Sequence, residues 1–154
     1  MPPSSSAISR RTLTVGTVFY HRDFEGHNVT KDRYFIVVGL SDTDFFCFTT
    51  STSEWLIENP YLSSQITPVI PMGCECFRKA CVVDCRELYS FDDILMSNYL
   101  NSGRVTVEGA LSPERLKLVA KIAKNSIMLN DREIAIVKSA LSEHWEPDEE
   151  SPSE

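Results

Sequence analysis

Two cations and three hydroxyl side chains stand at the ends of neighbouring apolar segments in this chain. Lys31 and Arg33 precede the first segment, and Thr49, Thr50 and Ser51 close the second. A guanidinium carries a planar fork of N–H donors that matches the oxygens of a phosphate, and an ammonium adds a compact positive charge. Holding a phosphate group is therefore the chemistry for which these residue types are suited, provided that the fold brings them together.

A β-hairpin is the element that would bring them together. Residues 34–40 and 45–49 are rich in β-branched and aromatic residues without helical spacing, and the polar residues 41–44 separate them. This pattern predicts two largely buried strands joined by a tight turn. In an antiparallel pair, the start of the first strand lies beside the end of the second. We therefore expect the cations and the hydroxyls to meet at one end of the sheet.

The overall composition is that of an ordinary soluble domain. The 154 residues are 42% hydrophobic and 24% charged, which allows one domain with a real core. No apolar segment approaches the about 20 residues that span a bilayer, and the N-terminus lacks the apolar core of a secretory signal. We expect a cytoplasmic protein with no membrane partner, in which the five cysteines are reduced thiols.

The net charge of −7 argues at first against a nucleic-acid partner, but the charge is unevenly distributed. Residues 145–154 carry five carboxylates and no cation, so residues 1–144 have a net charge of only −2. A nearly neutral body can still present a local basic patch. The acidic segment is predicted to be a disordered, solvated tail; the alternative is that it folds over a basic groove and imitates phosphates.

The remaining elements are predicted from turn, cap and periodicity signals. Residues 1–11 are expected to be disordered and residues 12–144 to form the folded domain, with a short strand at 17–20 and a polar loop at 21–30. Residues 52–61 after the hairpin are ambiguous, and residues 54–58 within them could form a single helical turn. The elements expected after them are an edge strand at 64–71, strands at 80–84 and 104–108, and helices at 90–103, 112–127 and 130–141. The sequence thus predicts an α+β fold, a small antiparallel β-body covered by C-terminal helices.

The predicted helices have recognisable ends and one clear apolar face. Their expected N-caps are Ser90, Ser112 before Pro113, and Asn130, which pairs with Glu133 in a capping box. Gly103 is expected to end the first of these helices. The buried face of the second is expected to consist of Leu116, Val119, Ala120, Ala123 and Ile127.

Five segments, taken in their order along the chain, carry a resemblance to a known family. They are Gly16-Thr-Val-Phe-Tyr, Lys31-Asp-Arg33 before its apolar strand, Cys47-Phe-Thr49-Thr50-Ser51, Ala80-Cys-Val-Val-Asp84, and Gly109-Ala-Leu111-Ser112-Pro-Glu114-Arg-Leu116. From about residue 16 to about residue 127 the chain resembles the PemK/MazF toxin endoribonucleases. It departs from that pattern where Tyr34 replaces the usual proline, in the short connection between Arg33 and Thr49, and in the cysteine-rich residues 72–85.

The resemblance implies both a fold and an activity. The fold would be a small Src-homology-3-like antiparallel β-barrel with C-terminal helices. The activity would be cleavage of single-stranded RNA without a metal or other cofactor, by a homodimer that an antitoxin protein holds inactive. Cleavage through the 2′-hydroxyl needs proton transfer and stabilisation of negative charge on phosphorus.

The resemblance also assigns roles to individual residues. Arg33 would stabilise the phosphate charge and Thr49 would position the phosphate, while Lys31, Thr50 and Ser51 would contact the RNA. The alternative is that Arg33 forms an ordinary surface ion pair and that the threonines are simply good strand residues.

Two histidines and two aromatic residues before the hairpin are further candidates. His21 and His27 could supply a general base or contact RNA, and the alternative is that both are merely solvated. Tyr20 and Phe24 could stack on bases, and the alternative is packing in the core.

Four cysteines raise the question of a zinc site. Cys74, Cys76, Cys81 and Cys85 would supply four thiolates, but the single-residue gap in the first pair is short for zinc. Buried, reduced thiols are the favoured interpretation, and no metal is expected.

Two other functions stay open. The chain could be a non-catalytic barrel that binds a protein or nucleic acid, which the missing proline and the net acidity favour. It could also be a barrel toxin of the related gyrase-inhibitor kind, although no residue of the chain points specifically to gyrase.

Overall fold

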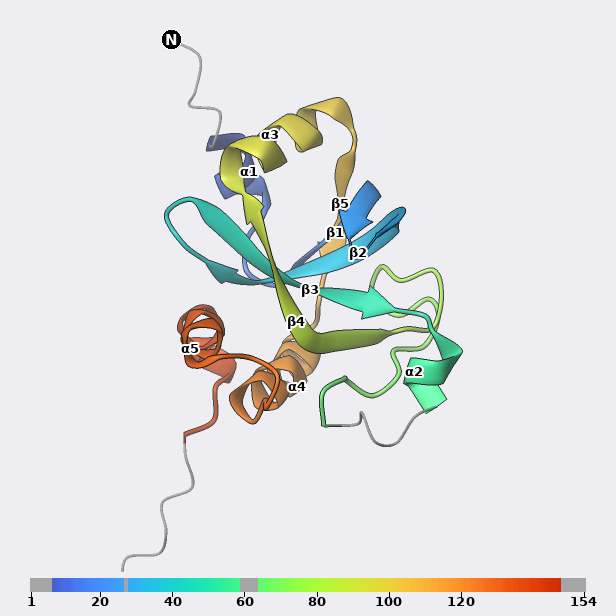
Figure 1. The fold of residues 1–154 in the computed structure, drawn as a ribbon, viewed down its shortest axis with the longest axis vertical. Helices are drawn as coiled ribbons and strands as arrows, with labels where there is room; N and C mark the ends of the chain where they lie inside the picture. The colour runs from blue at the N-terminus through green and yellow to red at the C-terminus, as the bar shows by residue number, and fades with distance from the viewer. Residues whose placement is uncertain (1–6, 27, 59–63, 148–154) are drawn as a thin grey trace, which may run out of the picture.

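Five antiparallel strands and the helices around them make up the part of the chain that the computed structural model describes, residues 7–26, 28–58 and 64–147 (Figure 1). The strands are β1 (Thr17–Gly26), β2 (Val29–Leu40), β3 (Asp44–Ser51), β4 (Val82–Asp92) and β5 (Val105–Ala110), arranged in the order β4-β3-β2-β1-β5. The helices are α1 (Ala7–Thr12), α2 (Glu54–Glu58), α3 (Asp93–Ser102), α4 (Pro113–Lys124), α5 (Asp131–Ala140) and the 3-10 helix η2 (Ser142–His144). The predicted α+β class is confirmed. β4 and β5 are the two edges of the sheet, which is not closed into a barrel within these residues.

The predicted hairpin is confirmed as β2 and β3. Phe35 pairs with Thr49 and Ile36 with Phe48, and the Ser41 N–H donates a 2.9 Å hydrogen bond to the Asp44 carbonyl at the turn. Both strands carry long buried stretches because the sheet is covered on its two faces, as their continuous apolar sequences indicate.

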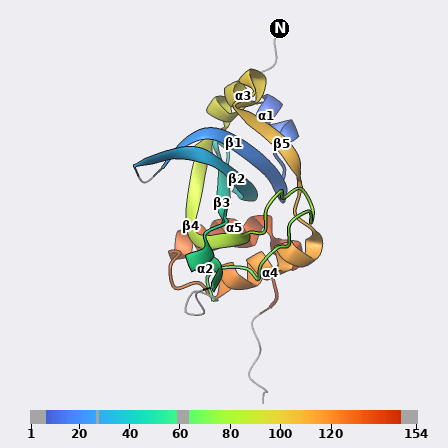
Figure 2. The ribbon, with the colours of Figure 1, turned by 90° about the vertical axis from the view of Figure 1, so that its right-hand side faces the viewer.

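The loop predicted at residues 21–30 is wrong. β1 continues to Gly26 and pairs with β2 as far as Val29, so that residues 22–26 and 28–33 form a two-stranded projection, here called the ribbon (Figure 2). The pairing of β2 with β3 starts only at Phe35, and that of β1 with β5 stops at His21. Because the ribbon extends past its neighbours, it is polar on most of its surface and lacks the apolar alternation that marks a half-buried strand.

Each face of the sheet has its own core. On one face, Ile36, Phe48 and Val83 pack with side chains of α4 and α5, and on the other, Phe19, Phe35 and Phe91 pack with Met96 of α3. Figure 1 shows α4 and α5 below the sheet and α1 and α3 above it. The two faces alternate along β2 and β3, so neighbouring residues of these strands point into different environments.

The close approach of α5 to β2 depends on a glycine. A Cβ atom at Gly39 would lie only 2.6 Å from Cγ2 of Ile136 on α5 and 3.1 Å from Cβ of Phe46. Position 39 must therefore lack a side chain for the helix to pack at this distance.

The helix caps were largely predictable. Ser112 caps α4 with Pro113 at its first position, Asn130 and Glu133 form the capping box of α5, and Gly103 ends α3 in the left-handed conformation at φ 82°. These three predictions are confirmed. The C-terminal bound predicted for the last helix also agrees, since Leu141 is the C-cap of α5.

Two helix predictions are wrong in detail. Ser90 does not cap α3: β4 runs on to Asp92, whose side chain accepts from the Leu95 N–H, because Phe91 is buried in the sheet opposite Phe45. Ile127 is 87% exposed rather than buried, since α4 ends at Lys124 and the residue falls in the following loop.

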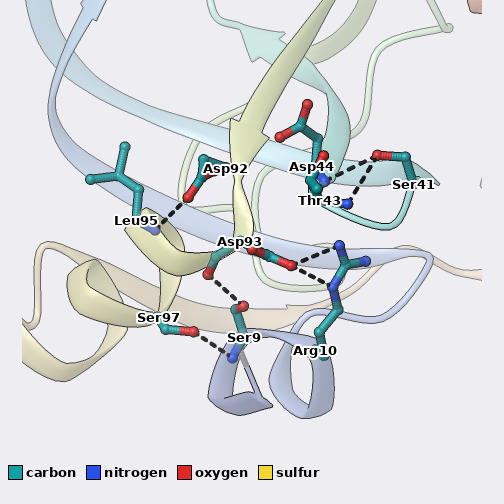
Figure 3. A network of polar contacts seen from close by, with 9 residues as sticks. All are labelled: Ser9, Arg10, Ser41, Thr43, Asp44, Asp92, Asp93, Leu95 and Ser97. Carbon is teal, nitrogen blue, oxygen red and sulfur yellow. Dashed lines mark hydrogen bonds and ion pairs between the residues drawn. The ribbon is translucent and has the colours of Figure 1, made fainter. Parts of the chain in front are cut away.

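The N-terminal prediction of disorder for residues 1–11 is wrong for residues 7–11, which belong to α1. Ser9 donates its hydroxyl hydrogen bond to the Asp93 carbonyl at 2.7 Å, and its own N–H donates to the Ser97 hydroxyl at 3.0 Å. Arg10 forms an ion pair with the Asp93 carboxylate at 2.9 Å (Figure 3). A six-residue helix is unstable alone, so these contacts with α3 hold it in place. Residues 1–6 lie outside the described part.

The segment predicted as an edge strand at 64–71 forms only two isolated bridges, Ile66 with Asp84 and Ile70 with Cys81. In the ambiguous segment after the hairpin, residues 54–58 do form a helical turn, α2. No helix among the described residues is long and apolar enough to cross a membrane. Most of the predicted tail, residues 148–154, lies outside the described residues.

Candidate functional site

Two cavities meet where β2 begins. The first, about 310 Å³, is here called the tyrosine cavity. The second, about 550 Å³, is here called the threonine cavity. Lys31 and Arg33 line both of them. Thr49 and Ser51 line the threonine cavity and Thr50 the tyrosine cavity, so the structure brings all five residues of the predicted cluster to one end of the sheet.

Strand alternation decides which residue faces which cavity. Because Phe35 pairs with Thr49, and Arg33 lies two residues before Phe35, the side chains of Arg33 and Thr49 project from the same face. Tyr34 and Thr50 have the opposite parity and line the tyrosine cavity. Arg33 and Thr49 therefore lie in one cavity, as the sequence predicted.

Thr49 is nevertheless almost completely buried, with 4% of its surface exposed. Its Oγ1 donates a hydrogen bond to the Tyr34 carbonyl at 2.9 Å. The hydroxyl proton is thus used within the hairpin, and the oxygen retains only its acceptor capacity. This geometry makes Thr49 part of the wall that carries Arg33 rather than an open donor to a bound group.

Strand β4, which is interrupted by a bulge, supplies most of the remaining wall of the threonine cavity. Cys47 pairs with Tyr89 and Thr49 with Asp84, so residues 85–88 of β4 face the single residue Phe48 of β3. Arg86 and Glu87, both within the bulge, line the cavity. Bulges of this kind commonly redirect side chains next to functional sites.

The charged side chains of the bulge form hydrogen bonds with neighbouring residues of β4. Arg86 donates from Nε to Oδ1 of Asp84 at 2.9 Å and from its terminal nitrogen to Oδ2 at 2.8 Å, and this bonding raises the pKa of Arg86. Burial, followed by the hydrogen bond with Glu87, raises the pKa of Tyr89 to about 12. Tyr89 is therefore a protonated phenol at neutral pH, and Glu87 is the carboxylate beside it.

The tyrosine cavity differs in both its charges and its surface. Its cations are Arg22, Lys31, Arg33, Arg78 and Lys79. Within residues 7–26, 28–58 and 64–147, no carboxylate forms an ion pair with any of these five. They surround an aromatic wall made of Tyr20, Tyr34 and Phe77. Uncompensated cations around aromatic rings are the combination that single-stranded nucleic acids bind.

The aromatic wall is fixed by its own packing. The rings of Tyr20 and Tyr34 lie 5.0 Å apart, and Phe77 meets Tyr34 edge-on at 5.6 Å. Tyr20 also donates its hydroxyl to Oδ2 of Asp32 at 2.8 Å. Tyr20 thus lines the cavity, as one of its two predicted roles requires. Phe24 instead packs against Phe35 at 4.9 Å, as the core alternative requires.

One loop supplies two of the five cations of the tyrosine cavity and one of its three aromatic residues. Residues 71–80 supply Phe77, Arg78 and Lys79, and an ion pair between Glu75 and Arg115 of α4 anchors the loop. The sequence prediction missed these residues, together with Arg22 of the ribbon. An aromatic residue followed by two cations was the available signal, but nothing in the sequence placed that loop beside β2.

His21 does not join the site. His21 is 3% exposed and packs against Phe24 and Tyr99, each 5.3 Å away, with Nδ1 beside the Arg22 carbonyl at 2.9 Å. Burial lowers the pKa of His21. The proposed RNA contact through His21 is therefore not supported. His27 lies outside the described residues.

All five cysteines are free thiols, which agrees with the prediction of reduced cysteines. Cys81 lines the tyrosine cavity, and burial raises its pKa to about 12, so it stays protonated at neutral pH. The described side chains contain no group of three or more His, Cys, Asp or Glu residues arranged to hold a metal ion.

Comparison with known proteins does not extend this description. No family model, no curated protein and no solved structure matches the chain.

Proposed function

We propose that the chain is a metal-independent endoribonuclease that binds single-stranded RNA across the two cavities and cleaves it at the threonine cavity. The observation that carries the proposal is the position of Arg33. It lines both cavities, and in one of them it does so together with Thr49 and Glu87. A guanidinium there can hold the scissile phosphate and stabilise charge that develops on it.

The distribution of cations supports RNA as the ligand. Six of the 15 lysines and arginines line the two cavities, although the chain has a net charge of −7. The six are Arg22, Lys31, Arg33, Arg78, Lys79 and Arg86. A local basic surface on an acidic protein concentrates a polyanion at that place.

Glu87 is the best placed proton acceptor for the reaction. In the proposed step, the 2′-hydroxyl gives its proton to the Glu87 carboxylate as its oxygen attacks the adjacent phosphorus. The bond from phosphorus to the 5′-oxygen breaks, and that oxygen takes a proton from water. The products are a 2′,3′-cyclic phosphate and a 5′-hydroxyl, and Glu87 returns its proton to the hydroxide. Arg33 stabilises the extra negative charge on phosphorus during the transfer.

Thr49 has a supporting part in this scheme. Its hydroxyl donates a hydrogen bond to the Tyr34 carbonyl, which fixes the strand end next to Arg33.

We place the chain, by its order of elements, with the PemK/MazF toxins, and regard its five-stranded sheet as an opened form of their barrel. A homodimer and an inhibitory antitoxin protein belong to the same proposal.

A second candidate function is binding of RNA without cleavage. The observation that favours it is the burial of two groups expected to act, since Thr49 is 4% and His21 3% exposed. Under this candidate the unpaired cations of the tyrosine cavity hold RNA, and the threonine cavity has no chemical task.

One experiment separates the two candidates. The full chain is incubated with labelled single-stranded RNA in EDTA, and binding of a 2′-deoxy oligomer of the same sequence is measured in parallel. We expect cleavage by the wild type and a loss of about 10²–10³-fold in Arg33→Ala. Arg132→Ala, which removes an exposed cation of α5 outside both cavities, is the matched control. Binding with no cleavage by the wild type would favour the second candidate, and cleavage that survives in Arg33→Ala would refute the assigned role.

A further inference from the structure

We infer that the tyrosine cavity is a base-selecting subsite, which binds one unstacked nucleobase that carries an exocyclic amino group. The inference rests on the proposed function, because the base would belong to a nucleotide next to the phosphate held by Arg33. Its basis is an aromatic wall, a carboxylate and five cations around one cavity of about 310 Å³. A cavity at the lower end of the usual range of about 300–1,000 Å³ suits one small ligand rather than a duplex.

The aromatic wall is suited to a base because it is already ordered. Tyr34 is held between Tyr20 and Phe77 at ring distances of 5.0 and 5.6 Å, so little side-chain entropy is lost when a base stacks on it. Phe77 is 2% exposed and supports Tyr34 from behind, while Tyr20 and Tyr34 remain partly exposed. The two tyrosines are therefore the rings that a base can reach.

Glu108 gives the cavity a means of choosing among bases. It is an exposed residue of β5 that lines the cavity, and its Oε1 accepts a 3.2 Å hydrogen bond from the Thr106 hydroxyl. None of the described residues donates a hydrogen bond to Oε2. The other carboxylate of the cavity, Asp32, already accepts from the Tyr20 hydroxyl and the Asp23 N–H. Glu108 can thus accept from the amino group of adenine, cytosine or guanine, whereas uracil offers no such group.

The surrounding cations link this subsite to the proposed chemistry. Arg78 and Lys79 stand on the loop side, Arg22 on the ribbon, and Lys31 and Arg33 on the wall that also faces the threonine cavity. A nucleotide with its base on Tyr34 would direct its phosphate toward that shared wall. The base would then be selected one step away from the bond that breaks.

Mononucleotides test the subsite directly, without requiring cleavage. AMP, CMP, GMP and UMP are titrated into the full chain, and binding is followed by NMR shifts of the tyrosine rings. We expect the three nucleotides with amino groups to bind about tenfold more tightly than UMP. Equal affinity for all four would refute selection through Glu108, and the lack of any binding at millimolar concentration would refute the subsite.

Two variants assign the effect to named side chains. Glu108→Gln should bring UMP to about the affinity of the other nucleotides, because the amide can both donate and accept. The control Glu143→Gln changes a carboxylate on η2, outside the cavity, and should leave the preference intact. Tyr34→Leu should weaken every nucleotide about five- to 150-fold, whereas Tyr34→Phe keeps the ring and should retain binding. Circular dichroism confirms that each variant is folded, and an unchanged preference in folded Glu108→Gln would contradict the inference.

RNA competition distinguishes a subsite for RNA from a site for free nucleotides. A single-stranded 2′-deoxy oligomer should displace bound AMP from the wild type, and failure to displace it would overturn the assignment to RNA. The proposed function can fail separately. If the protein selects among nucleotides but does not cleave RNA, the subsite is supported and the nuclease proposal is refuted. If cleavage is lost in Arg33→Ala but no nucleotide binds, the nuclease proposal is supported and the subsite is refuted.

Discussion

The two cavities share Lys31 and Arg33 but differ in how their other charges are held. Around the threonine cavity, Arg86 donates from two of its guanidinium nitrogens to Asp84, and Glu87 is hydrogen-bonded to Tyr89. Around the tyrosine cavity, Arg78 and Lys79 form no ion pair within the described chain. Fixed, compensated charges suit a place where a proton must move at a defined atom, and uncompensated cations suit attraction of a polyanion. We therefore expect the proposed binding and the proposed cleavage to respond separately to substitutions in the two cavities.

The largest effect is expected from the variant that tests chemistry alone. Glu87→Gln keeps the size of the side chain in the threonine cavity but removes its capacity to take a proton. We expect cleavage to fall by about 10²–10⁴-fold. Binding of a 2′-deoxy oligomer should change little, because the residue is not one of the cations. The measurement is single-turnover cleavage with enzyme in excess. Comparable losses of binding and cleavage would show that the two cavities are not separable.

The next variant tests the tyrosine cavity in the same way. Arg78→Ala with Lys79→Ala removes two cations without carboxylate partners in the described structure. We expect the slope of log affinity for single-stranded RNA against log salt to decrease in magnitude by about 1.4, since each phosphate contact contributes about 0.7.

Arg86→Ala provides the contrasting case for that measurement. Its guanidinium is already neutralised by Asp84, so its removal should change the salt slope by less than the about 0.7 that one phosphate contact contributes. Fluorescence anisotropy over a series of salt concentrations gives both slopes. A larger change in Arg86→Ala than in the double variant would reverse the comparison.

A smaller effect is expected at Thr49, which lines the threonine cavity. Thr49→Val retains the shape of the side chain but leaves the Tyr34 carbonyl without its hydroxyl donor. We expect the free energy of unfolding to fall by about 1 kcal/mol. Cleavage should fall much less than in Glu87→Gln, because the hydroxyl proton is used inside the protein. Urea titration and the same cleavage assay check this. A loss of activity as large as that of Glu87→Gln would restore a direct part for the hydroxyl.

Sequence patterns predicted the hairpin and therefore the meeting of Arg33 with Thr49, because both depend on local alternation and on a turn that is short in sequence. The same holds for the caps at Ser112 and Asn130, which are satisfied within a few residues. Signals of this kind are complete within a short window.

The features that escaped prediction depend on distant contacts. Helix α1 exists because Ser9 and Arg10 bind α3, more than 80 residues away in the chain. The loop with Arg78 and Lys79 reaches the site because Glu75 binds Arg115. The ribbon is polar because it projects past the sheet, so its sequence resembled a loop. The loop residues of the tyrosine cavity, and Arg22 on the ribbon, could therefore not be predicted from local sequence signals.

The smallest effect concerns His21, which is the cross-strand partner of Arg33 in the pairing of β1 with β2. Burial is the main cause of its lowered pKa; Arg104 nearby lowers it further, whereas the Arg22 carbonyl, Asp23 and Asp32 oppose the shift. Above the usual pKa of about 6.5 the ring is neutral in both the folded and the unfolded chain. As the pH falls below that value, the unfolded chain takes up the proton first, so the folded state loses stability until the pH reaches the lowered pKa.

We therefore expect the melting temperature to fall more between pH 7.5 and 5.5 in the wild type than in His21→Phe, which keeps an aromatic ring among Phe24 and Tyr99. His144→Gln, at a partly exposed position in η2, should behave like the wild type. Thermal unfolding followed by circular dichroism at several pH values measures the difference. Because carboxylates elsewhere affect all three proteins alike, only the difference between them reports on His21. Equal losses in the wild type and His21→Phe would mean that folding does not change the pKa of the His21 ring, which would contradict the lowering that its burial causes.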